Sequence, residues 1–317
     1  MPAKSILVTG ATGFLGRHTM LALTREYGEQ NVKGISSKDY DLMDPKQVDK
    51  ALSNYKPDVV IHLAAYSGGI GANRTYPADF YFRNTILTAL MFEYSHRHKV
   101  KKLVYPMGGC SYPAKAKSPI TEDQMWEGFP QSESAPYSLA KKMGIIASQS
   151  YHTQYGLTST VIVPGNMYGQ YDNFELLNSH VVPAMIRRYY EARLKHAHEV
   201  VMWGSGKPTR DFVYAADVAA TFPYFIEASE ISGPINISSG TRTSIRNLAE
   251  LIAELTGFEG SIKWDAEKPD GQIDKIFSTE KLRSLGLGCS TPLREGLKLT
   301  IDWFAKSYNE KSDGLRI

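Results

Sequence analysis

The sequence predicts a doubly wound α/β fold, in which helices cover both faces of a parallel sheet, with a smaller unit in the C-terminal part of the chain. Short runs rich in valine and isoleucine alternate with helical patterns over the first half of the chain, and a glycine-spaced turn follows the first run. Buried parallel strands are almost continuously apolar, and each needs a crossover helix to reach the next. A chain of 317 residues with 42% hydrophobic content is long enough for one large domain with a smaller annex.

Hydrophobic periodicity places the strands and helices of the first unit. Five short apolar runs indicate strands at residues 6–9, 32–35, 59–63, 102–105 and 160–163. Helical patterns between them lie at residues 16–26, 45–55, 78–98 and 136–155. A helix between successive strands lets each strand run in the same direction as the one before it, so we expect a parallel sheet.

The alternation weakens after Pro164, where a second unit begins. Residues 166–178 have the composition of a loop, and residues 181–191 have a helical pattern. Residues 212–226 and 235–239 are similar in character to the first unit. We therefore predict a first domain at residues 1–165, with returning segments near 212–240, and a second domain made mainly of residues 166–317.

Composition and charge argue against several classes of partner. The net charge of +3 is small and shows little clustering, which argues against nucleic acid. No apolar run approaches the roughly 20 residues that a membrane span needs, so we expect no membrane segment. The two cysteines, Cys110 and Cys289, do not make a disulfide framework, and no leader pattern precedes the first strand. These features predict a cytoplasmic protein.

The turn Gly10-Ala11-Thr12-Gly13-Phe14-Leu15-Gly16 lies between the first predicted strand and the first predicted helix. Glycines at this spacing allow a tight turn, a close approach of the backbone to a pyrophosphate, and close packing of the helix on the sheet. The unpaired N–H groups and partial positive charge at the start of the helix favour the phosphates. Glycines also serve ordinary strand-to-helix turns, but the position of this turn in the chain predicts a dinucleotide site.

The residues after the second strand bear on the choice of dinucleotide. Ser36-Ser37-Lys38 stands where an acidic residue would bind the ribose 2′-hydroxyl of NAD, and hydroxyls with a cation better suit a 2′-phosphate. We therefore predict NADP(H), while Asp39 keeps NAD as an alternative. Asp41 and Leu42 are candidates for the adenine side of the site. A carboxylate for the adenine amino group is also available from Asp44, which is equally suited to the N-cap of the next helix.

Tyr137 and Lys141 form the candidate chemical centre. They are four residues apart on a predicted helix, so their side chains share a face. A free tyrosine has a pKa of about 10, and a nearby ammonium together with an oxidised nicotinamide favours the phenolate and brings the pKa toward neutrality. Tyr137 would then give a proton to a carbonyl oxygen as hydride arrives at the carbon. This spacing also occurs in surface helix pairs, but together with the upstream glycine turn it predicts carbonyl chemistry.

Several motifs give the chain a resemblance to the extended short-chain dehydrogenase/reductase family. They are the glycine turn, Tyr137-x-x-x-Lys141, His62-Leu63-Ala64-Ala65 and Arg210-Asp211-Phe212-Val213-Tyr214-x-x-Asp217. Longer strings, which together span nearly the whole chain, resemble the GDP-L-fucose synthase group more closely. These strings are Gly68-Gly69-Ile70-x-Ala72-Asn73-x-x-Tyr76-Pro77-Ala78-Asp79-Phe80, Asn166-x-Tyr168-Gly169-x-x-Asp172-Asn173-Phe174, Asn178-Ser179-His180-Val181, Trp203-Gly204-Ser205-Gly206 and Lys268-Pro269-Asp270-Gly271.

The resemblance implies a Rossmann-type sheet followed by a smaller substrate-binding domain. It also implies an NADPH-dependent enzyme that inverts C3 and C5 of GDP-4-keto-6-deoxymannose and then reduces C4. A GDP-sugar is the implied substrate, with guanine resting on the resemblance alone. The resemblance further implies a homodimer formed through the helices near residues 78–98 and 136–155, a role in polysaccharide biosynthesis, and no metal.

Inversion beside a ketone needs a base on one face of the sugar and an acid on the other, and the resemblance assigns these roles to Cys110 and His180. Taken alone, a buried structural cysteine and a histidine that merely begins a helix are the alternatives. The resemblance places further cofactor contacts at Leu63, Ala64, Ala65, Pro164, Asn166, Met167 and His180. It places substrate contacts at Gly108, Gly109, Ser111, Asn166, Arg187, Trp203, Arg210, Lys268 and Asp270.

The residue types support part of this substrate site independently. A diphosphate needs permanent cations, which Arg187 and Arg210 supply, while Arg188 and Lys207 add to the field or are simply solvated. Asn166 follows the fifth strand, at the carboxyl end where ligands of open α/β sheets bind. The indole of Trp203 is suited to packing against the sugar or the nucleotide, and equally to a core position in a strand.

Gly108 departs from the family pattern. In the family, a serine two residues before the cysteine bonds the substrate oxygen beside the tyrosine, and Gly108 stands at that place. Losing one such donor typically lowers the rate on the order of 10²-fold, unless Ser111 or a water replaces it. Gly108 either opens the pocket for a bulkier sugar or weakens hydride transfer while isomerisation is retained. The sequence therefore predicts an NADPH-dependent GDP-sugar 4-ketoreductase with or without C3/C5 epimerisation. The alternatives are an epimerase with little net hydride transfer and a non-catalytic dinucleotide-binding sensor.

Overall fold

A six-stranded sheet forms the centre of the larger part of the molecule, in which every paired strand is parallel, with strand order β10-β5-β4-β3-β1-β2. The structure is a computed structural model that describes residues 4–176, 178–229, 231–268, 270–310 and 315–317. The strands are β1 (Ile6–Thr9), β2 (Val32–Ile35), β3 (Val59–His62), β4 (Lys102–Pro106), β5 (Thr158–Pro164) and β10 (Ile235–Ile237). The register pairs Ile6 with Val32 on one side and with Val59 on the other.

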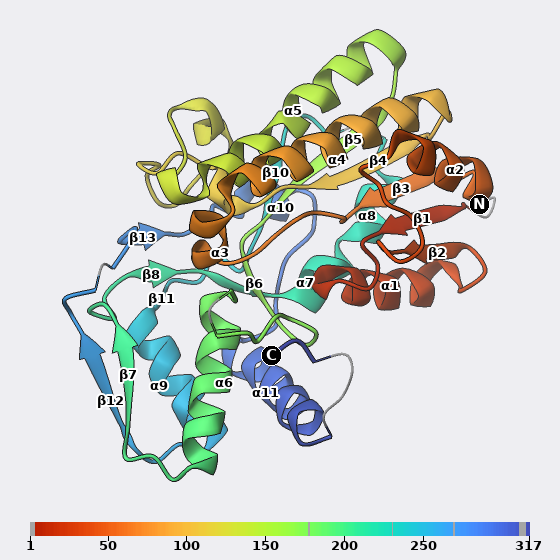
Figure 1. Cartoon of the computed structure of the whole chain (residues 1–317). Helices are drawn as coiled ribbons and strands as arrows, with labels where there is room; N and C mark the ends of the chain where they lie inside the picture. Colours follow the sequence, from red (N-terminus) through yellow and green to blue (C-terminus); the bar gives the residue numbers. More distant parts are fainter. Residues whose placement is uncertain (1–3, 177, 230, 269, 311–314) are drawn as a thin grey trace.

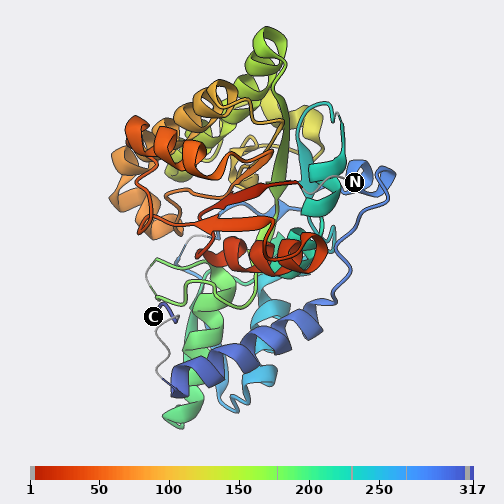
Figure 2. The same ribbon diagram turned by 90° about the vertical axis from the view of Figure 1, so that its right-hand side faces the viewer.

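Alternate residues of each strand supply two separate hydrophobic cores, one on each face of the sheet. In β1, Leu7 packs on one face, whereas Ile6 and Val8 pack on the other. Helices α2 (Pro45–Tyr55), α4 (Pro77–Arg97) and α5 (Ala135–Tyr155) cover the first face. Helices α1 (Phe14–Tyr27), α7 (Ala215–Ala220) and α8 (Phe222–Glu227) cover the second, as Figures 1 and 2 show. The predicted doubly wound fold is thus confirmed.

A third hydrophobic core holds the C-terminal part of the chain together. Its buried residues come mainly from α6 (Val181–Leu194), α9 (Ile245–Thr256) and α11 (Leu293–Asn309). This part lies below the large sheet in Figure 1 and includes the parallel pair β7 (Glu199–Trp203) and β12 (Ser261–Asp265). A small sheet with order β11-β8-β13 consists of β8 (Thr209–Arg210), β11 (Thr243–Ser244) and β13 (Asp274–Lys275). The remaining elements are α3 (Ile70–Thr75), α10 (Glu280–Ser284) and the short 3₁₀ helices η1 (Gly109–Ser111), η2 (Glu122–Trp126) and η3 (Ser132–Ser134).

The predicted loop at residues 166–178 is wrong in its first residues. There β6 (Asn166–Tyr168) pairs in parallel with β9 (Phe212–Tyr214), and Asn173 makes an isolated bridge to Arg316. Both pairings join residues more than 40 positions apart, so no local pattern reveals them. Leu177 in this segment and Pro269 in the C-terminal motif lie outside the described residues. None of the helices in the described ranges has the length and apolar character of a membrane span.

Candidate active site

The glycine turn between β1 and α1 accepts no side chain at two of its positions. Gly10 has a φ of 67°, and a Cβ there would lie 2.8 Å from the backbone nitrogen of Ala64. A Cβ at Gly16 would lie 2.1 Å from the carbonyl oxygen of Gly10. Gly13 precedes α1, whose first turn carries no acidic residue to repel an anion. The turn therefore brings bare backbone to the start of a helix, which fits the pyrophosphate of a dinucleotide.

The hydroxyl of Thr9 connects this turn to the loop that follows β3. Its Oγ1 lies 2.9 Å from Nδ1 of the buried His62 and accepts a hydrogen bond from the backbone nitrogen of Ala64 at 3.2 Å. The structure thereby brings the predicted cofactor residues Leu63, Ala64 and Ala65 together with Gly10. They lie at the carboxyl ends of β1 and β3, where ligands of doubly wound sheets bind. Pro164, Asn166 and Met167 follow from the carboxyl end of β5 in the same sheet.

The turn after β2 contains a carboxylate as well as the predicted hydroxyls and cation. Both the backbone nitrogen and the Oγ of Ser36 donate to Oδ2 of Asp39, each at 2.8 Å. These hydrogen bonds lower the pKa of Asp39, so a negative charge stands at this end of the cofactor site. The glycine turn, which contains Thr12, Phe14 and Leu15, is joined to the end of β2 by a hydrogen bond from the Ala11 backbone nitrogen to the carbonyl oxygen of Ile35 at 3.1 Å. The predicted residues Ser37, Lys38, Asp41 and Leu42 follow Ser36. Asp44 caps α2 by accepting from the backbone nitrogen of Lys46 at 2.9 Å, which confirms its N-cap role.

Tyr137 and Lys141 lie one turn apart near the start of α5, as their spacing predicts. Burial is the main cause that raises the pKa of Tyr137 above its ordinary value, with Cys110 and Tyr105 adding to it. Burial also lowers the pKa of Lys141 to about 7. Both shifts arise because a crowded interior disfavours the charged form of each group. Without a bound dinucleotide, the phenol therefore keeps its proton at neutral pH.

The ring of Tyr105 in β4 holds the end of the Lys141 side chain. The Lys141 Nζ lies 4.1 Å from the ring centroid, within the range of a cation–π interaction. The Tyr105 hydroxyl is fixed in turn by Thr88 Oγ1 at 2.7 Å. Tyr105 is completely buried, so close packing holds the ring that supports Lys141.

Two reciprocal hydrogen bonds join the Cys110 loop to the helix that carries Tyr137. Ser111 Oγ donates to the carbonyl oxygen of Ser138 at 3.1 Å, and Ser138 Oγ donates to the carbonyl oxygen of Cys110 at 3.1 Å. Ser111 is fully buried and its hydroxyl is committed to this link. It is therefore not placed to replace the missing serine of the family, which corrects one of the two predicted replacements.

Gly108 lies directly between Cys110 and Tyr137. A Cβ built on Gly108 would lie 3.1 Å from the Cys110 Sγ, 3.2 Å from the Tyr137 Cε1 and 3.6 Å from the Tyr137 hydroxyl oxygen. The gap beside the phenol is therefore small, because a single Cβ would already fill it. Gly109 has a different role, because its own Cβ would lie 2.4 Å from Cζ of Phe277. Gly109 is buried against that ring and is not directed toward a substrate.

His180 approaches the same region from the other part of the chain. It precedes α6, and the residues just before it rest on the loop after β3, where Gly69 donates from its backbone nitrogen to the carbonyl oxygen of Asn178 at 2.9 Å. The ring of Phe80, in the helix that follows, lies 6.1 Å from the ring of Tyr137. His180 keeps an exposed surface, yet its crowded surroundings lower the pKa of the imidazole. This combination is typical of a residue in the wall of a cleft.

The two predicted diphosphate arginines have different surroundings. Arg187 is engaged inside the C-terminal part, with its Nε 2.7 Å from a carboxylate oxygen of Glu191 and one Nη donating to the carbonyl oxygen of Phe174 at 3.3 Å. Arg210 in β8 donates to the carbonyl oxygen of Thr209 at 2.7 Å. Burial lowers the pKa of Arg210, and the nearby carboxylates of Asp274 and Asp211 oppose that shift. Because Arg187 is already paired with a carboxylate, Arg210 is the better candidate for a diphosphate contact.

Arg188, whose role the sequence left open, extends from α6 to β7. Its Nη1 donates to the carbonyl oxygen of Val201 at 3.0 Å, in the strand that ends with Trp203. Trp203 is 69% exposed, so the alternative that it is a core aromatic is wrong. The signal for choosing between the arginines was present in the sequence, because Glu191 stands four residues after Arg187 on a helix and predicts an ion pair.

The remaining predicted substrate residues lie around the turn after β7. The carboxylate of Asp270 accepts from the backbone nitrogen of Ser205 at 2.6 Å and from its Oγ at 2.7 Å, which fixes the turn beside Trp203. Lys268 is exposed on the loop leading to it. Asn166 donates from Nδ2 to the backbone oxygen of Asp211 at 2.9 Å, which leaves its side-chain oxygen available.

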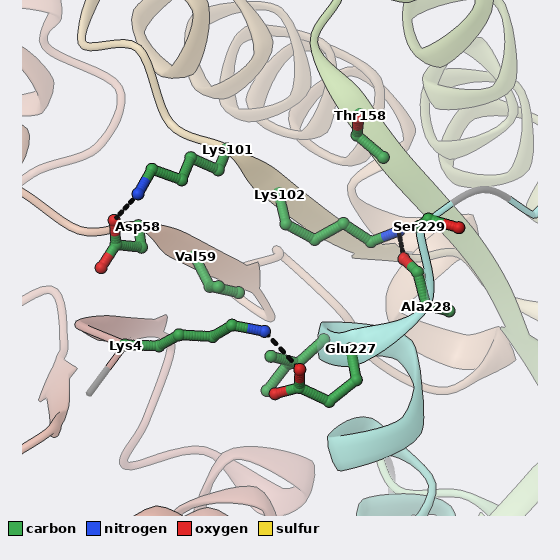
Figure 3. Close-up of a pocket in the computed structure, with 10 residues that line it drawn as sticks. Lys4, Asp58, Val59, Lys101, Lys102, Thr158, Glu227, Ala228 and Ser229 are labelled. Carbon is green, nitrogen blue, oxygen red and sulfur yellow. Dashed lines mark hydrogen bonds and ion pairs between the residues drawn. The ribbon is translucent and has the colours of Figure 1, made fainter. Parts of the chain in front are cut away.

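A separate cavity of about 440 Å³ lies at the opposite, amino-terminal edge of the sheet. Figure 3 shows its lysines engaged by neighbouring groups, with Lys101 Nζ 2.8 Å from Asp58 and Lys102 donating to the backbone oxygen of Ala228 at 2.8 Å. Because ligands of open α/β sheets bind beyond the carboxyl ends of the strands, this cavity is not the candidate site. Within the described ranges, no group of three or more His, Cys, Asp or Glu side chains is arranged to hold a metal.

Comparison with known proteins gives consistent matches over the whole chain. The model of the NAD dependent epimerase/dehydratase family matches residues 6–238. GDP-L-fucose synthase 1 of Arabidopsis thaliana is 38% identical over 308 residues, which cover 96% of this chain and 94% of that protein. The solved structure of a GDP-L-fucose synthetase from Naegleria fowleri bound to NADP has a TM-score of 0.88 and 28% identity, and the match covers 100% of this chain and 97% of that one. A GDP-6-OMe-4-keto-L-xylo-heptose reductase from C. jejuni has a TM-score of 0.88 and 25% identity, with coverages of 97% and 99%.

Proposed function

The chain belongs to the NAD dependent epimerase/dehydratase family, and on this premise we propose that it is a GDP-sugar 4-ketoreductase of the fucose synthase type. The observation that carries the proposal is the convergence of Tyr137, Cys110 and Gly108 beside the glycine-turn end of the sheet. A proton donor and a candidate base lie together there, with a residue that has no side chain between them. The names of the relatives support a GDP-linked 4-ketosugar as the substrate.

Tyr137 acts as the proton donor in the proposed reduction. The bound dinucleotide supplies a hydride to the carbonyl carbon, and the carbonyl oxygen becomes an alkoxide unless a proton arrives with it. Because burial keeps the phenol protonated, Tyr137 is in the state that reduction requires. Lys141, whose pKa is lowered to about 7, exchanges protons at neutral pH and stabilises the phenolate that remains.

Cys110 and His180 carry the proposed inversion at the carbons beside the ketone. As a thiolate, Cys110 takes the proton of the C–H bond, an S–H bond forms, and the electron pair moves into the enolate. His180 then returns a proton to the opposite face of the ring. The Cys110 loop is fastened to α5, whereas His180 belongs to the start of α6, so the two groups reach the sugar from different elements.

Arg188, Arg210 and Trp203 are the proposed contacts for the nucleotide end of the substrate. A guanidinium group can pair with a diphosphate, and both arginines donate to backbone carbonyl oxygens, Arg188 to Val201 and Arg210 to Thr209. The exposed indole of Trp203 offers a flat apolar surface next to them. The solved C. jejuni relative is titled a heptose reductase, so the sugar in question includes heptoses as well as 6-deoxyhexoses.

NADP(H) is the proposed cofactor, and a homodimer the proposed assembly. The NADP-bound relative supports the first, together with the Ser36-Ser37-Lys38 segment. For the second, α4 and α5 pack side by side and expose Tyr81, Phe82, Met143 and Ile146, each at least 40% accessible. Exposed apolar side chains on a pair of packed helices suit a subunit interface. Both cysteines are free thiols, in keeping with the reducing cytoplasm where we place the enzyme.

A second candidate, isomerisation without net reduction, is favoured by Gly108 alone. Oxidation of NADPH followed at 340 nm with a panel of GDP-4-ketosugars separates the two. Reductase activity predicts cofactor oxidation that Tyr137→Phe abolishes while NADPH still binds. Deuterium entering from solvent beside the ketone, with no NADPH consumed by any sugar of the panel, would instead establish the isomerase.

A further inference from the structure

The ring of Phe277 lies directly against the loop that carries Gly108 and Cys110. A Cβ built on Gly109 would lie 2.4 Å from Cζ of this ring, and 3.1 and 3.2 Å from its Cε1 and Cε2. The backbone of Gly109 does not have a positive φ, so its conformation is open to other residues. The ring of Phe277, and not backbone strain, therefore excludes a side chain at position 109.

Phe277 is fastened in place by its own surroundings. Its side chain is fully buried, and its ring lies 5.7 Å from the ring of Tyr112 between centroids. Its backbone nitrogen donates to Oδ2 of the buried Asp211 at 3.0 Å. The residues on either side of Phe277 exchange backbone hydrogen bonds with Ile120, at 2.7 and 2.8 Å. Because a packed interior leaves little room for an aromatic ring to move, the ring is a firm support for Gly109.

The loop that rests on this ring has little freedom in its distance from Tyr137. A Cβ at Gly108 would lie 3.1 Å from the Cys110 Sγ and 3.2 Å from the Tyr137 Cε1, so these groups are already close to contact. A shift of the loop by a few tenths of an ångström would change the spacing of the proposed base and proton donor. Small misplacements of reacting groups lower rates steeply, so the support beneath the loop matters for the chemistry.

We propose that Phe277 is a positioning residue, whose ring supports Gly109 and thereby sets the distance of Cys110 and Gly108 from Tyr137. The ring and the glycine act as a fitted pair, since the missing side chain at position 109 makes room for the ring. The inference deepens the proposed function and rests on it for the identity of the reaction, but not for the position of the loop. Phe277 follows β13, which pairs with the strand of Arg210, so the support comes from the part of the chain that carries the proposed diphosphate contact.

The test follows the position of the loop without any sugar. In a Cys289→Ala background, in which Cys110 is the sole thiol, the rate of alkylation by iodoacetamide reports the surroundings of Cys110. Phe277→Leu removes the end of the ring and Gly109→Ala adds a methyl group that overlaps it, so each should change the rate at least about threefold. In the double variant the smaller side chain accommodates the methyl group, and the rate should return to within about twofold of the parent.

Phe225→Leu is the matched control. Phe225 is also fully buried, but it lies in the hydrophobic core on the other face of the sheet. The substitution removes the same atoms and should lower stability in urea unfolding, while the alkylation rate stays that of the parent. A general loosening of the protein would change the rate in both Phe→Leu variants, whereas a positioning role changes it only in Phe277→Leu.

A second measurement asks whether the support matters for turnover. With a GDP-4-ketosugar, Phe277→Leu should lower kcat roughly tenfold while the Kd for NADPH is unchanged, and the double variant should recover. The proposal is overturned if Phe277→Leu alkylates at the parent rate, if Phe225→Leu changes the rate equally, or if the double variant does not recover. Should Gly109→Ala fail to fold by circular dichroism, the comparison of the two Phe→Leu variants decides the question. A parent protein that reduces no ketosugar would reject the proposed function and leave the alkylation result standing.

Discussion

Restoring a hydroxyl at position 108 tests the account of the reduction site most informatively. The backbone of Gly108 has φ −91° and ψ 145°, so Gly108→Ser introduces no backbone strain. Its Cβ would lie 3.6 Å from the Tyr137 oxygen, a separation at which a serine hydroxyl reaches that oxygen at about 2.8 Å. The same Cβ would lie 3.1 Å from the Cys110 Sγ and 3.2 Å from the Tyr137 Cε1, so both neighbours must yield by a few tenths of an ångström.

These distances set the expected size of the effect. One donor to a developing oxyanion contributes on the order of 10²-fold to kcat, or about 3 kcal/mol, while mild overpacking costs about 1 kcal/mol. We therefore expect Gly108→Ser to raise kcat for a GDP-4-keto-6-deoxyhexose by roughly tenfold or more. Gly108→Ala carries the same Cβ without the hydroxyl and should lower kcat. Turnover is measured by NADPH oxidation at 340 nm in both variants, and equal kcat values for Ser and Ala would refute the placement of this position beside the reacting oxygen.

Three further predictions concern charge. Asp172→Asn should stabilise the protein by about 2 kcal/mol at pH 8 and by little at pH 4, measured by urea unfolding. Burial raises the pKa of this carboxyl to about 7, so the stability that the neutral carboxyl contributes is lost as pH rises from about 4 to 7. A stability gain that is equal at both pH values would contradict that assignment. Asp39→Asn should shift the kcat/KM ratio toward NADPH over NADH by roughly fivefold, since a carboxylate near the ribose repels a 2′-phosphate. An unchanged ratio would place Asp39 away from the ribose. Arg188→Met should weaken GDP binding, measured by calorimetry, at least about tenfold. Arg187→Met should leave GDP binding nearly unchanged and instead lower the stability of the protein. The reverse result would identify Arg187 as the residue that binds GDP.

Local patterns were sufficient for three elements at and beyond the glycine turn. β1, β2 and α2 begin and end at the predicted residues, because strong apolar runs, glycines and a Pro-containing N-cap mark their limits. The resemblance to extended short-chain dehydrogenases is confirmed by the family match. By contrast, β6 and the Asn173–Arg316 bridge depend on distant partners, and no local signal predicts them.

Sequence reasoning was insufficient for chemical properties that burial or long-range packing determines. The predicted fall in the pKa of Tyr137 depends on an ammonium and an oxidised nicotinamide, whereas burial without the dinucleotide disfavours the charged forms of both the phenol and the amine. Ser111 was a reasonable donor by sequence position, yet its hydroxyl fastens η1 to α5. Phe277 reaches Gly109 only through the small sheet and the segment that follows it, and sequence order gives no indication of this contact.

The central claim is that Tyr137 protonates a sugar ketone at C4 while hydride arrives from the dinucleotide. It is tested most directly with NADPH deuterated at the transferring position and a GDP-4-ketosugar as substrate, the product being analysed by NMR. The account predicts one deuterium at C4 per NADPH oxidised with the native protein, and none with a Tyr137→Phe variant that still binds NADPH. Deuterium at C4 in equal amount with the Phe variant, or no label at C4 with the native protein, would contradict it.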